Sequence, residues 1–212
     1  FNAASRGLKP DPYINLKDWA NQYFRLTKEA SVEPGRYRTS RTPYVEEILM
    51  ELSPQSDTSE VVVIKPTQSG FTTLANIFLF GTAHLYPGPA MMAMPTDDMA
   101  KKHSKKKVAP SIRAIPALDG VIAKAKSRDS GNTLLLKEFP GGSWTFTGSN
   151  SPASARSDSV RYLILDDYDG FIQEAGDEGA PGDLLKKRTD AFGNKKKIYI
   201  NSTPTVRGSS HI

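Results

Sequence analysis

The sequence predicts an α/β fold with a mostly parallel central sheet and helices on both faces. Short apolar runs rich in β-branched residues alternate along the chain with segments of helical periodicity, and this alternation is typical of a parallel sheet. Polar residues follow several of the apolar runs. In such folds ligands bind beyond the carboxyl ends of the strands, so we expect a site there.

The composition is that of a globular protein with room for one large domain. Of the 212 residues, 38% are hydrophobic and 24% are charged. The absence of cysteine excludes a disulfide framework and thiolate metal sites. No apolar run approaches the ~18–20 residues of a membrane helix, and the first residues lack the apolar stretch of a signal peptide. We therefore expect a soluble, cytosolic protein without a membrane partner. The net charge of +5 permits a polyanionic partner without requiring one.

The N-terminal part is expected to be an arm followed by helices. The first 15 residues contain two prolines and scattered polar groups. Asn15 or Asp18 is placed to cap a helix with one apolar face, formed by Leu16, Trp19, Ala20, Tyr23 and Phe24. A second helix is predicted from Pro43 to Leu52, with proline in its first turn. We expect residues 1–45 to pack on a main domain formed by residues 46–212.

From residue 60 onward the pattern predicts strands. The continuous run at 61–65 is typical of a strand buried on both faces, and a helical face follows it. A lysine-rich helix is expected to end at about Ile115. Further strands are predicted at 90–94, 160–167 and 197–204, and a β-pair at 133–136 and 143–148 around the turn Pro140–Gly142.

The first motif is the segment KPTQSGFTT, which lies between a predicted strand and a helix. Its spacing is that of a P-loop, G-x-x-x-x-G-K-[ST], with two changes. Lys65 holds the first glycine position, and Phe71 holds the usual lysine position. Gly70 would let successive backbone N–H groups face an anion. A helix N-cap after a buried strand, formed by Ser69 or Thr72, would give the same pattern.

The P-loop interpretation assigns a task to each part of this segment. Lys65 can reach across the loop to the terminal phosphates of ATP, and Thr72 can offer its hydroxyl to Mg²⁺. The residues expected to bind ATP are Lys65, Pro66, Thr67, Gln68, Ser69, Gly70, Phe71, Thr72 and Thr73.

The second motif is an apolar strand, 162–165, that ends in Asp166 and Asp167. This is the form of a Walker B element, in which the first acid anchors Mg²⁺ and the second polarises the attacking water. Such strands are common alone, but with a P-loop upstream they indicate Mg²⁺-dependent ATP hydrolysis. Most such enzymes have Glu where Asp167 stands, so we expect slow turnover. Asp169 is a competing water-positioning residue, although on a strand that continued straight it would share a face with Asp167.

The third motif is the polar segment NSTPT at the end of the last predicted strand. The hydroxyls of Ser202 and Thr203 are placed to sense a γ-phosphate and to couple its loss to movement. A turn that ends a strand would have the same composition.

With these three elements in order, the chain resembles the large terminase subunit of tailed bacteriophages, of the lambda GpA type. The resemblance runs from about Trp19 to the last residue, and the strings SRDSGNTLL and STPTVRG are its most specific parts. Members of that family have a lysine at the front of the P-loop, as Lys65 is here. The matching segments are GRYRTSRTPY (35–44), VVIKPTQSGFT (62–72), MAMPTDDMAKK (92–102), PSIRAIPAL (110–118), SRDSGNTLLLKEFPGG (127–142), SARSDSVRYLILDD (154–167) and NSTPTVRG (201–208).

The resemblance implies a P-loop NTPase fold of the ASCE or RecA-like kind. It implies a motor that hydrolyses ATP to push double-stranded DNA through the portal into a procapsid, in the host cytoplasm. Its partners would be the terminase small subunit, the portal and further copies of the chain in a ring. The family also has a C-terminal nuclease domain. Nothing here matches that domain, so we expect these residues to be the ATPase domain alone.

The resemblance also makes Arg156 the best candidate for an arginine finger that reaches a neighbouring subunit, although a surface arginine on a loop would fit equally well. Two departures from the family concern the site. Asp167 replaces the usual Glu, and Thr73 replaces a second basic residue of lambda's loop.

Other residues and functions stay open. A lysine-rich helix face could contact DNA phosphates, although we favour a face that is merely solvated. Its residues are Lys101, Lys102, Lys105 and Lys106. Three aromatic residues, Trp19, Tyr23 and Tyr44, could stack on adenine. We favour packing roles for them. The histidines show no metal-binding spacing. The rival functions are a helicase-like translocase, for which the sequence shows neither an unwinding wedge nor a second RecA-like domain, and a nucleotide-binding scaffold with little turnover.

Overall fold

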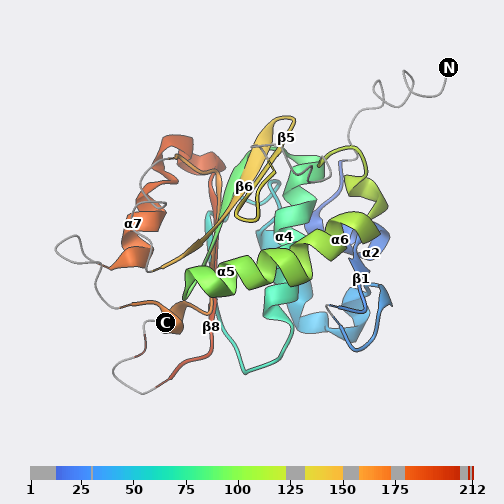
Figure 1. Cartoon of the computed structure of the whole chain (residues 1–212), viewed down its shortest axis with the longest axis horizontal. Coiled ribbons are helices and arrows are strands. Elements are labelled where there is room, and N and C mark those ends of the chain that lie inside the picture. Colours follow the sequence, from blue (N-terminus) through green and yellow to red (C-terminus); the bar gives the residue numbers. More distant parts are fainter. Residues whose placement is uncertain are drawn as a thin grey trace.

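A computed structural model of the chain describes residues 13–29, 31–122, 132–149, 158–172, 180–205, 210 and 212. At its centre lies a six-stranded sheet with the strand order β3-β8-β7-β4-β6-β5 (Figure 1). All neighbouring pairs are parallel except β5 and β6, which form an antiparallel hairpin. The strands are β3 (Glu60–Ile64), β4 (Pro89–Met94), β5 (Leu136–Phe139), β6 (Gly142–Gly148), β7 (Tyr162–Asp166) and β8 (Lys197–Ser202). The predicted mostly parallel sheet is confirmed.

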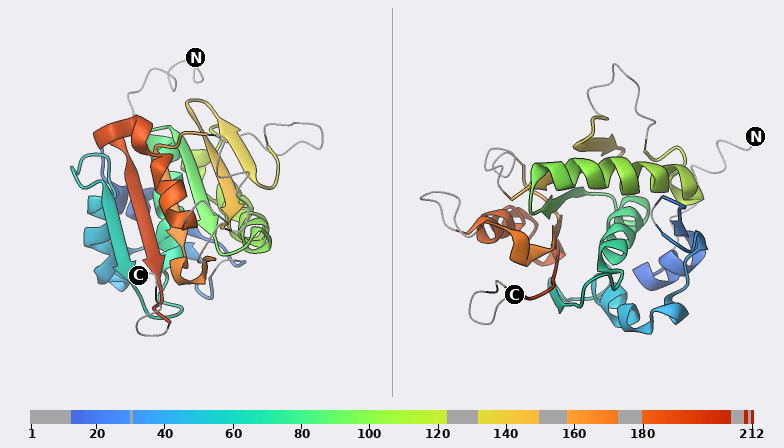
Figure 2. Two further views of the ribbon diagram at one scale, coloured as in Figure 1. Left: turned by 90° about the vertical axis from the view of Figure 1, so that its left-hand side faces the viewer. Right: turned by 60° about the horizontal axis from the view of Figure 1, so that its bottom comes forward.

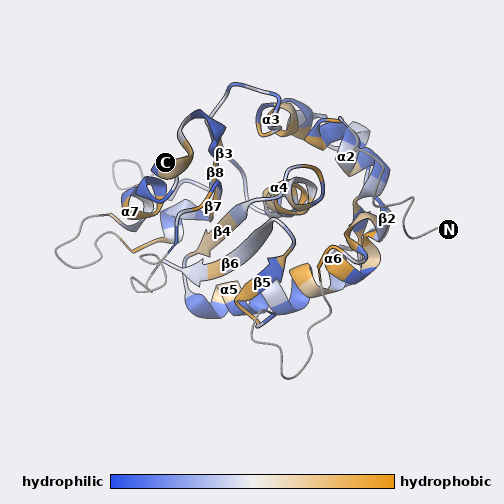
Figure 3. Cartoon of the chain, turned by 90° about the horizontal axis from the view of Figure 1, so that it is seen from above, coloured by the Kyte–Doolittle hydropathy of each residue, from blue (hydrophilic) through white to orange (hydrophobic). Residues whose placement is uncertain are grey.

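Helices cover both faces of the sheet, as predicted. The main helices are α2 (Leu16–Tyr23), α3 (Glu46–Glu51), α4 (Phe71–Leu85), α5 (Asp97–His103), α6 (Ala109–Ala114) and α7 (Pro181–Lys187). Figure 3 shows α7 on one side of the sheet and α4 on the other, with α2 and α3 beyond α4. Side chains alternate between two cores, because successive strand residues point to opposite faces. In β4, Met92 packs in the core with α4, whereas its neighbour Met91 packs with α7.

The N-terminal helix α2 forms as predicted. Asn15 is its cap, since the Asn15 side chain accepts a hydrogen bond of 2.9 Å from the backbone N–H of Asp18. Leu16 and Trp19 are fully buried in the same core as α4. The two helices approach closely at Gly81 of α4, where a Cβ would collide with the Leu16 side chain. Most of the predicted arm lies outside the described residues. No helix in the described ranges is both long and apolar enough to cross a membrane.

The prediction that the first main strand is buried on both faces is wrong. This strand, β3, lies at one edge of the sheet, with the β5–β6 hairpin at the other edge (Figure 2). Val61 and Val63 pack against the core, but Val62 is 53% exposed and Ile64 is 65% exposed. This apolar run therefore forms an edge strand that is buried on only one face.

The predicted hairpin exists, but its first strand starts later than expected. Strand β5 begins at Leu136, where the predicted strand 133–136 ends. The Thr133 hydroxyl accepts a hydrogen bond of 3.1 Å from the N–H of Leu136, so these residues form a turn that leads into the strand. Two other strands are shorter than predicted, because β7 ends at Asp166 and β8 ends at Ser202.

The lysine-rich helix has the expected extent but is not uniform. A π-helical segment, Ser104–Val108, joins α5 to α6. Pro110, the second residue of α6, lacks the N–H of an α-helical hydrogen bond, and its ring would crowd the carbonyl four residues earlier. A wider turn before the proline relieves that crowding. The helix ends at Ala114.

Candidate active site

The loop of residues 65–70 joins β3 to the N-terminus of α4, which has 15 residues. Gly70 has a φ of 86°, a left-handed conformation that glycine adopts without steric cost. No side chain of the described residues caps α4, and the Ser69 hydroxyl instead donates to the Pro66 carbonyl at 2.7 Å. The N-cap alternative for Ser69 and Thr72 is therefore wrong. The first turn of α4 keeps N–H groups that can bind an anion.

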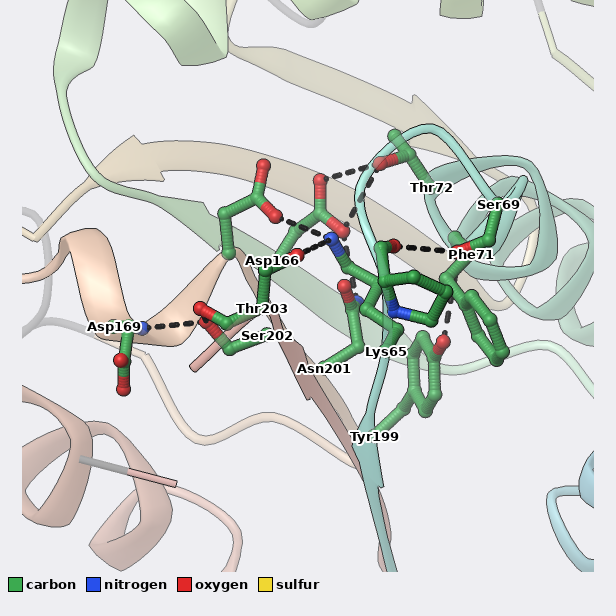
Figure 4. A network of polar contacts seen from close by, with 12 residues as sticks. Lys65, Ser69, Phe71, Thr72, Asp166, Asp169, Tyr199, Asn201, Ser202 and Thr203 are labelled. Carbon is green, nitrogen blue, oxygen red and sulfur yellow. Dashed lines mark hydrogen bonds and ion pairs between the residues drawn. The ribbon is translucent and has the colours of Figure 1, made fainter. Parts of the chain in front are cut away.

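The Lys65 side chain crosses from β3 to the ends of two neighbouring strands. Its Nζ donates to Oδ1 of Asp167 at 2.7 Å and lies 3.4 Å from Oγ1 of Thr203 (Figure 4). Lys65 is only 8% exposed. The lysine at the front of the loop thus points into the site, where it is paired with the second carboxylate.

Asp166 is fully buried at the end of β7 and is surrounded by donors. The Thr72 hydroxyl lies 3.1 Å from its Oδ2, and Asn201 Nδ2 donates to its Oδ1 at 2.8 Å (Figure 4). Burial raises the pKa of Asp166 to about 6, while the hydrogen bond from Asn201 acts in the opposite direction. Asn201 was not among the predicted site residues. In the sequence its role is indicated by no more than one amide side chain within a predicted strand.

Asp167 ends the strand with an abrupt change of direction. It has φ 56° and ψ 52°, and a 3₁₀ turn, Tyr168–Gly170, follows it. Among the described residues only Gln68 and Asp167 combine a side chain with positive φ, and both lie in this site. Non-glycine residues in the left-handed region are found preferentially at functional sites. The turn directs the Asp167 carboxylate toward Lys65.

The strand does not continue straight to Asp169, because Asp167 turns the chain and a 3₁₀ turn follows. The Asp169 carboxylate accepts hydrogen bonds from the N–H of Thr205 at 2.8 Å and from the Ser210 hydroxyl at 2.7 Å. Its own N–H donates to the Ser202 hydroxyl at 2.8 Å. Asp169 thus joins the segments that follow β7 and β8.

These side chains meet at a cleft of about 300 Å³, which lies beyond the carboxyl ends of β3, β7 and β8. Lys65, Asp167, Ser202 and Thr203 line it together with Thr67 and Gln68 of the loop. The structure therefore brings together the residues predicted from three separate motifs. Arg156 lies outside the described residues.

Comparison with known proteins identifies the family. Residues 31–212 match the family described as "Phage terminase large subunit gpA, ATPase domain". The chain belongs to this family. It is 30% identical over 206 residues to the terminase large subunit of Enterobacteria phage P21, and 28% identical over 207 residues to that of Escherichia phage lambda. Each alignment covers 96% of this chain but 31% of the relative, so the chain spans about a third of their length.

A solved structure supports the fold. The ATPase domain of the Thermus phage P74-26 large terminase matches with a TM-score of 0.50 and 14% sequence identity, over 69% of this chain and 60% of that one. This likeness concerns the fold alone.

Two of the three aromatic residues considered for stacking on adenine have packing roles. Trp19 is fully buried and donates from Nε1 to Nδ1 of His84, so the favoured packing role is confirmed. Tyr23 packs edge-on against His84. Tyr44 is different, because its hydroxyl donates to the Ser69 carbonyl at 2.9 Å and its ring lies 5.7 Å from that of Phe71. It thus supports the loop from outside.

The residues expected to hold Mg²⁺ fit that ion. The described chain contains no group of three or more His, Cys, Asp or Glu side chains that could hold a metal. Mg²⁺ needs no such cage in nucleotide sites, because it takes one or two carboxylates together with phosphates and waters. Asp166 and the Thr72 hydroxyl, 3.1 Å apart, offer the oxygen ligands of such a site.

Proposed function

We propose that this chain is the Mg²⁺-dependent ATPase of a viral motor that moves double-stranded DNA into a procapsid. The observation that supports the proposal most directly is the convergence of Lys65, Asp166 and Asp167 beside the uncapped N-terminus of α4. A cation for phosphates, an anchor for a metal and a carboxylate near the cleft are the parts that ATP hydrolysis requires. Membership of the terminase family supplies the context of DNA packaging.

In this proposal each side chain has one task. The loop N–H groups and Lys65 hold the phosphates, while Thr72 and Asp166 hold Mg²⁺. When bound, Mg²⁺ supplies positive charge to the β- and γ-phosphate oxygens. Asp167 accepts a hydrogen bond from the water whose oxygen attacks the γ-phosphorus as the bond to the bridging oxygen breaks. Thr203 and Ser202 would sense the γ-phosphate; in support, Thr203 lies beside Lys65 and Ser202 accepts a hydrogen bond from Asp169 in the turn after β7.

The exchange of partners at Lys65 links binding to catalysis. Lys65 Nζ pairs with Asp167 Oδ1 at 2.7 Å and so competes with the water that Asp167 would position. A γ-phosphate that attracts Lys65 would release Asp167 for that role. Hydrolysis would therefore begin only when the phosphate is in place.

The proposal includes the partners that the family resemblance implies. They are double-stranded DNA, the terminase small subunit and the portal of a procapsid in the host cytoplasm, with copies of the chain in a ring. Arg156 would then act on the nucleotide of a neighbouring copy.

A second candidate is a nucleotide-binding scaffold with little turnover. The specific observation in its favour is the ion pair of 2.7 Å between Lys65 and Asp167, which holds both groups away from their tasks. Separate measurements of ATP affinity and turnover distinguish the two functions, because a scaffold would bind ATP tightly and release almost no phosphate.

The test is the substitution Lys65→Ala, with Lys187→Ala, an exposed lysine on α7, as the control. Loss of a charge-assisted hydrogen bond to phosphate costs about 1.5–3 kcal/mol in binding, and more in the transition state. We expect Lys65→Ala to abolish Mg²⁺-dependent phosphate release without lowering the melting temperature, and to stop DNA packaging when placed in the full-length subunit. Normal turnover in a well-folded Lys65→Ala protein would refute the proposed site.

A further inference from the structure

A second, smaller cavity lies beside the first turn of α4. It has a volume of about 60 Å³ and shares no lining residue with the catalytic cleft. Three parts of the chain surround it: α4, the strand β1 (Arg25–Leu26) and the helical segment after α5. Its polar lining residues are Arg25, Thr72, Thr73, Asn76, Lys107 and Ser111.

The cavity is positively charged. Its described lining contains two cations, Arg25 and Lys107, and no carboxylate. The position of Arg25 is fixed by hydrogen bonds from Nη1 to the carbonyls of Gln22 and Phe24, at 3.1 and 3.0 Å. Two charges of the same sign around a small space favour an anion as its occupant.

The neighbouring histidine adds no further charge to this space. His103 is buried and bonded through Nε2 to Asn76 Oδ1 at 2.9 Å. Burial, and secondarily the charge of Lys107, lower the pKa of His103 to about 4, so it is neutral near pH 7. Lys107 and Arg25 therefore provide the positive charge.

The cavity adjoins the part of the loop that meets the inner phosphates. In P-loop proteins the backbone of the loop and first helical turn cradles the α- and β-phosphates, while the lysine reaches the β- and γ-phosphates. Thr72 and Thr73 form this first turn here and also line the cavity. The volume suffices for a few waters or one phosphate group, and is far below the ~300 Å³ needed to enclose a whole ligand.

We infer that Arg25 and Lys107 bind the α-phosphate of the nucleotide beside the first turn of α4. This inference rests on the proposed function and assigns two binding residues outside all three motifs. The α-phosphate is common to ATP and ADP. The two cations therefore hold substrate and product equally, whereas Lys65 contacts the phosphates that hydrolysis separates.

The test compares Lys107→Gln with Lys106→Gln, a change at the exposed neighbouring lysine of the same π-helical segment. Binding of ADP and of a non-hydrolysable ATP analogue is measured by calorimetry with Mg²⁺. We expect Lys107→Gln to weaken both ligands by the same factor, about tenfold or more, since a hydrogen bond to a charged group is worth about 1.5–3 kcal/mol. Lys106→Gln should change neither, and Lys107→Arg should restore most of the affinity.

The two diastereomers of ADPαS, in which sulfur replaces one or the other non-bridging α-oxygen, test the contact itself. Wild-type protein should bind one diastereomer more weakly, and Lys107→Gln should lose this discrimination. Unchanged ADP affinity in folded Lys107→Gln, or equal binding of the diastereomers by wild-type protein, would overturn the inference. The proposed function fails separately, if Lys65→Ala hydrolyses ATP normally.

Discussion

The ion pair between Lys65 and Asp167 predicts that ATP should bind more tightly when Asp167, the proposed catalytic carboxylate, is removed. Asp167→Asn keeps the shape of the side chain but removes the charge that holds Lys65 Nζ at 2.7 Å. The Lys65 side chain is 9% exposed and that of Asp167 is 43% exposed, so solvent screens the pair. An ion pair of this kind contributes about 1 kcal/mol. Since 1.4 kcal/mol is a factor of ten, ATP should bind about fivefold more tightly.

Turnover should change in the opposite direction. A positioned general base contributes about 10²–10⁴-fold to rate, so phosphate release by Asp167→Asn should fall by at least about 10². Calorimetric titration with a non-hydrolysable ATP analogue and a phosphate-release assay measure the two effects. Asp190→Asn, which removes the carboxylate of a surface pair with Lys196, is the matched control. If Asp167→Asn bound ATP no more tightly than wild-type protein, Asp167 would not compete with phosphate for Lys65. If its turnover were normal, another group would position the water.

Three further predictions concern the same strand end and its neighbourhood. Asp167→Glu should raise kcat with little change in KM in steady-state assays. The reason is that one more methylene extends the carboxylate by roughly an ångström, and misplacement of that size can cost ~10²-fold in rate. A lower kcat would mean that the pocket suits the shorter acid. Arg156→Ala, a prediction from the sequence, should leave the isolated domain unchanged but lower the ATPase rate of assembled full-length subunits by about 10³–10⁵, and an equal loss in the monomer would exclude action between subunits. Asp166→Asn should stabilise the Mg²⁺-free protein at pH 8 by up to about 3 kcal/mol and have no effect near pH 4, as followed by urea unfolding in EDTA. The sign follows because the folded-state pKa of about 6 lies above the ordinary 3.8, so stability is complete below about pH 4 and is lost as the pH rises through 6. A variant no more stable than wild-type protein at pH 8 would contradict this.

Local patterns in the sequence predicted the parts of the site that depend on neighbouring residues. Gly70 permits a left-handed turn, and the loop after β3 therefore leads into α4 as its spacing indicates. Asp166 follows an apolar strand and reaches the same sheet edge as Lys65, because parallel strands end together. Strand, turn and helix signals within about ten residues suffice for such predictions.

The errors concern features that distant parts of the chain determine. The run at 61–65 has the composition of a buried strand, but its burial depends on strand order, and β3 pairs only with β8 near the C-terminal end. A central position would have covered Val62 and Ile64. The role of Asn201 was missed for the same reason, since its partner Asp166 lies on a neighbouring strand and 35 positions away in sequence. The change of direction before Asp169 was not predicted either, because nothing in the local pattern indicates the left-handed conformation of Asp167.

That left-handed residue explains how two adjacent carboxylates acquire different tasks. On a regular strand, Asp166 and Asp167 would point to opposite faces of the sheet, and only one could face the nucleotide. The turn at Asp167 brings the second carboxylate to Lys65, while the first stays fully buried beside Thr72 and Asn201. Each carboxylate thus has protein donors in the places that its ligands would take: Thr72 and Asn201 for the metal at Asp166, and Lys65 for the water at Asp167. In the proposed mechanism ATP and Mg²⁺ would displace contacts on both carboxylates, and Lys65 and Thr72 belong to the loop and to the first turn of α4 that would bind the phosphates. We therefore expect binding of the nucleotide and binding of the metal to be coupled through the loop and the first turn of α4.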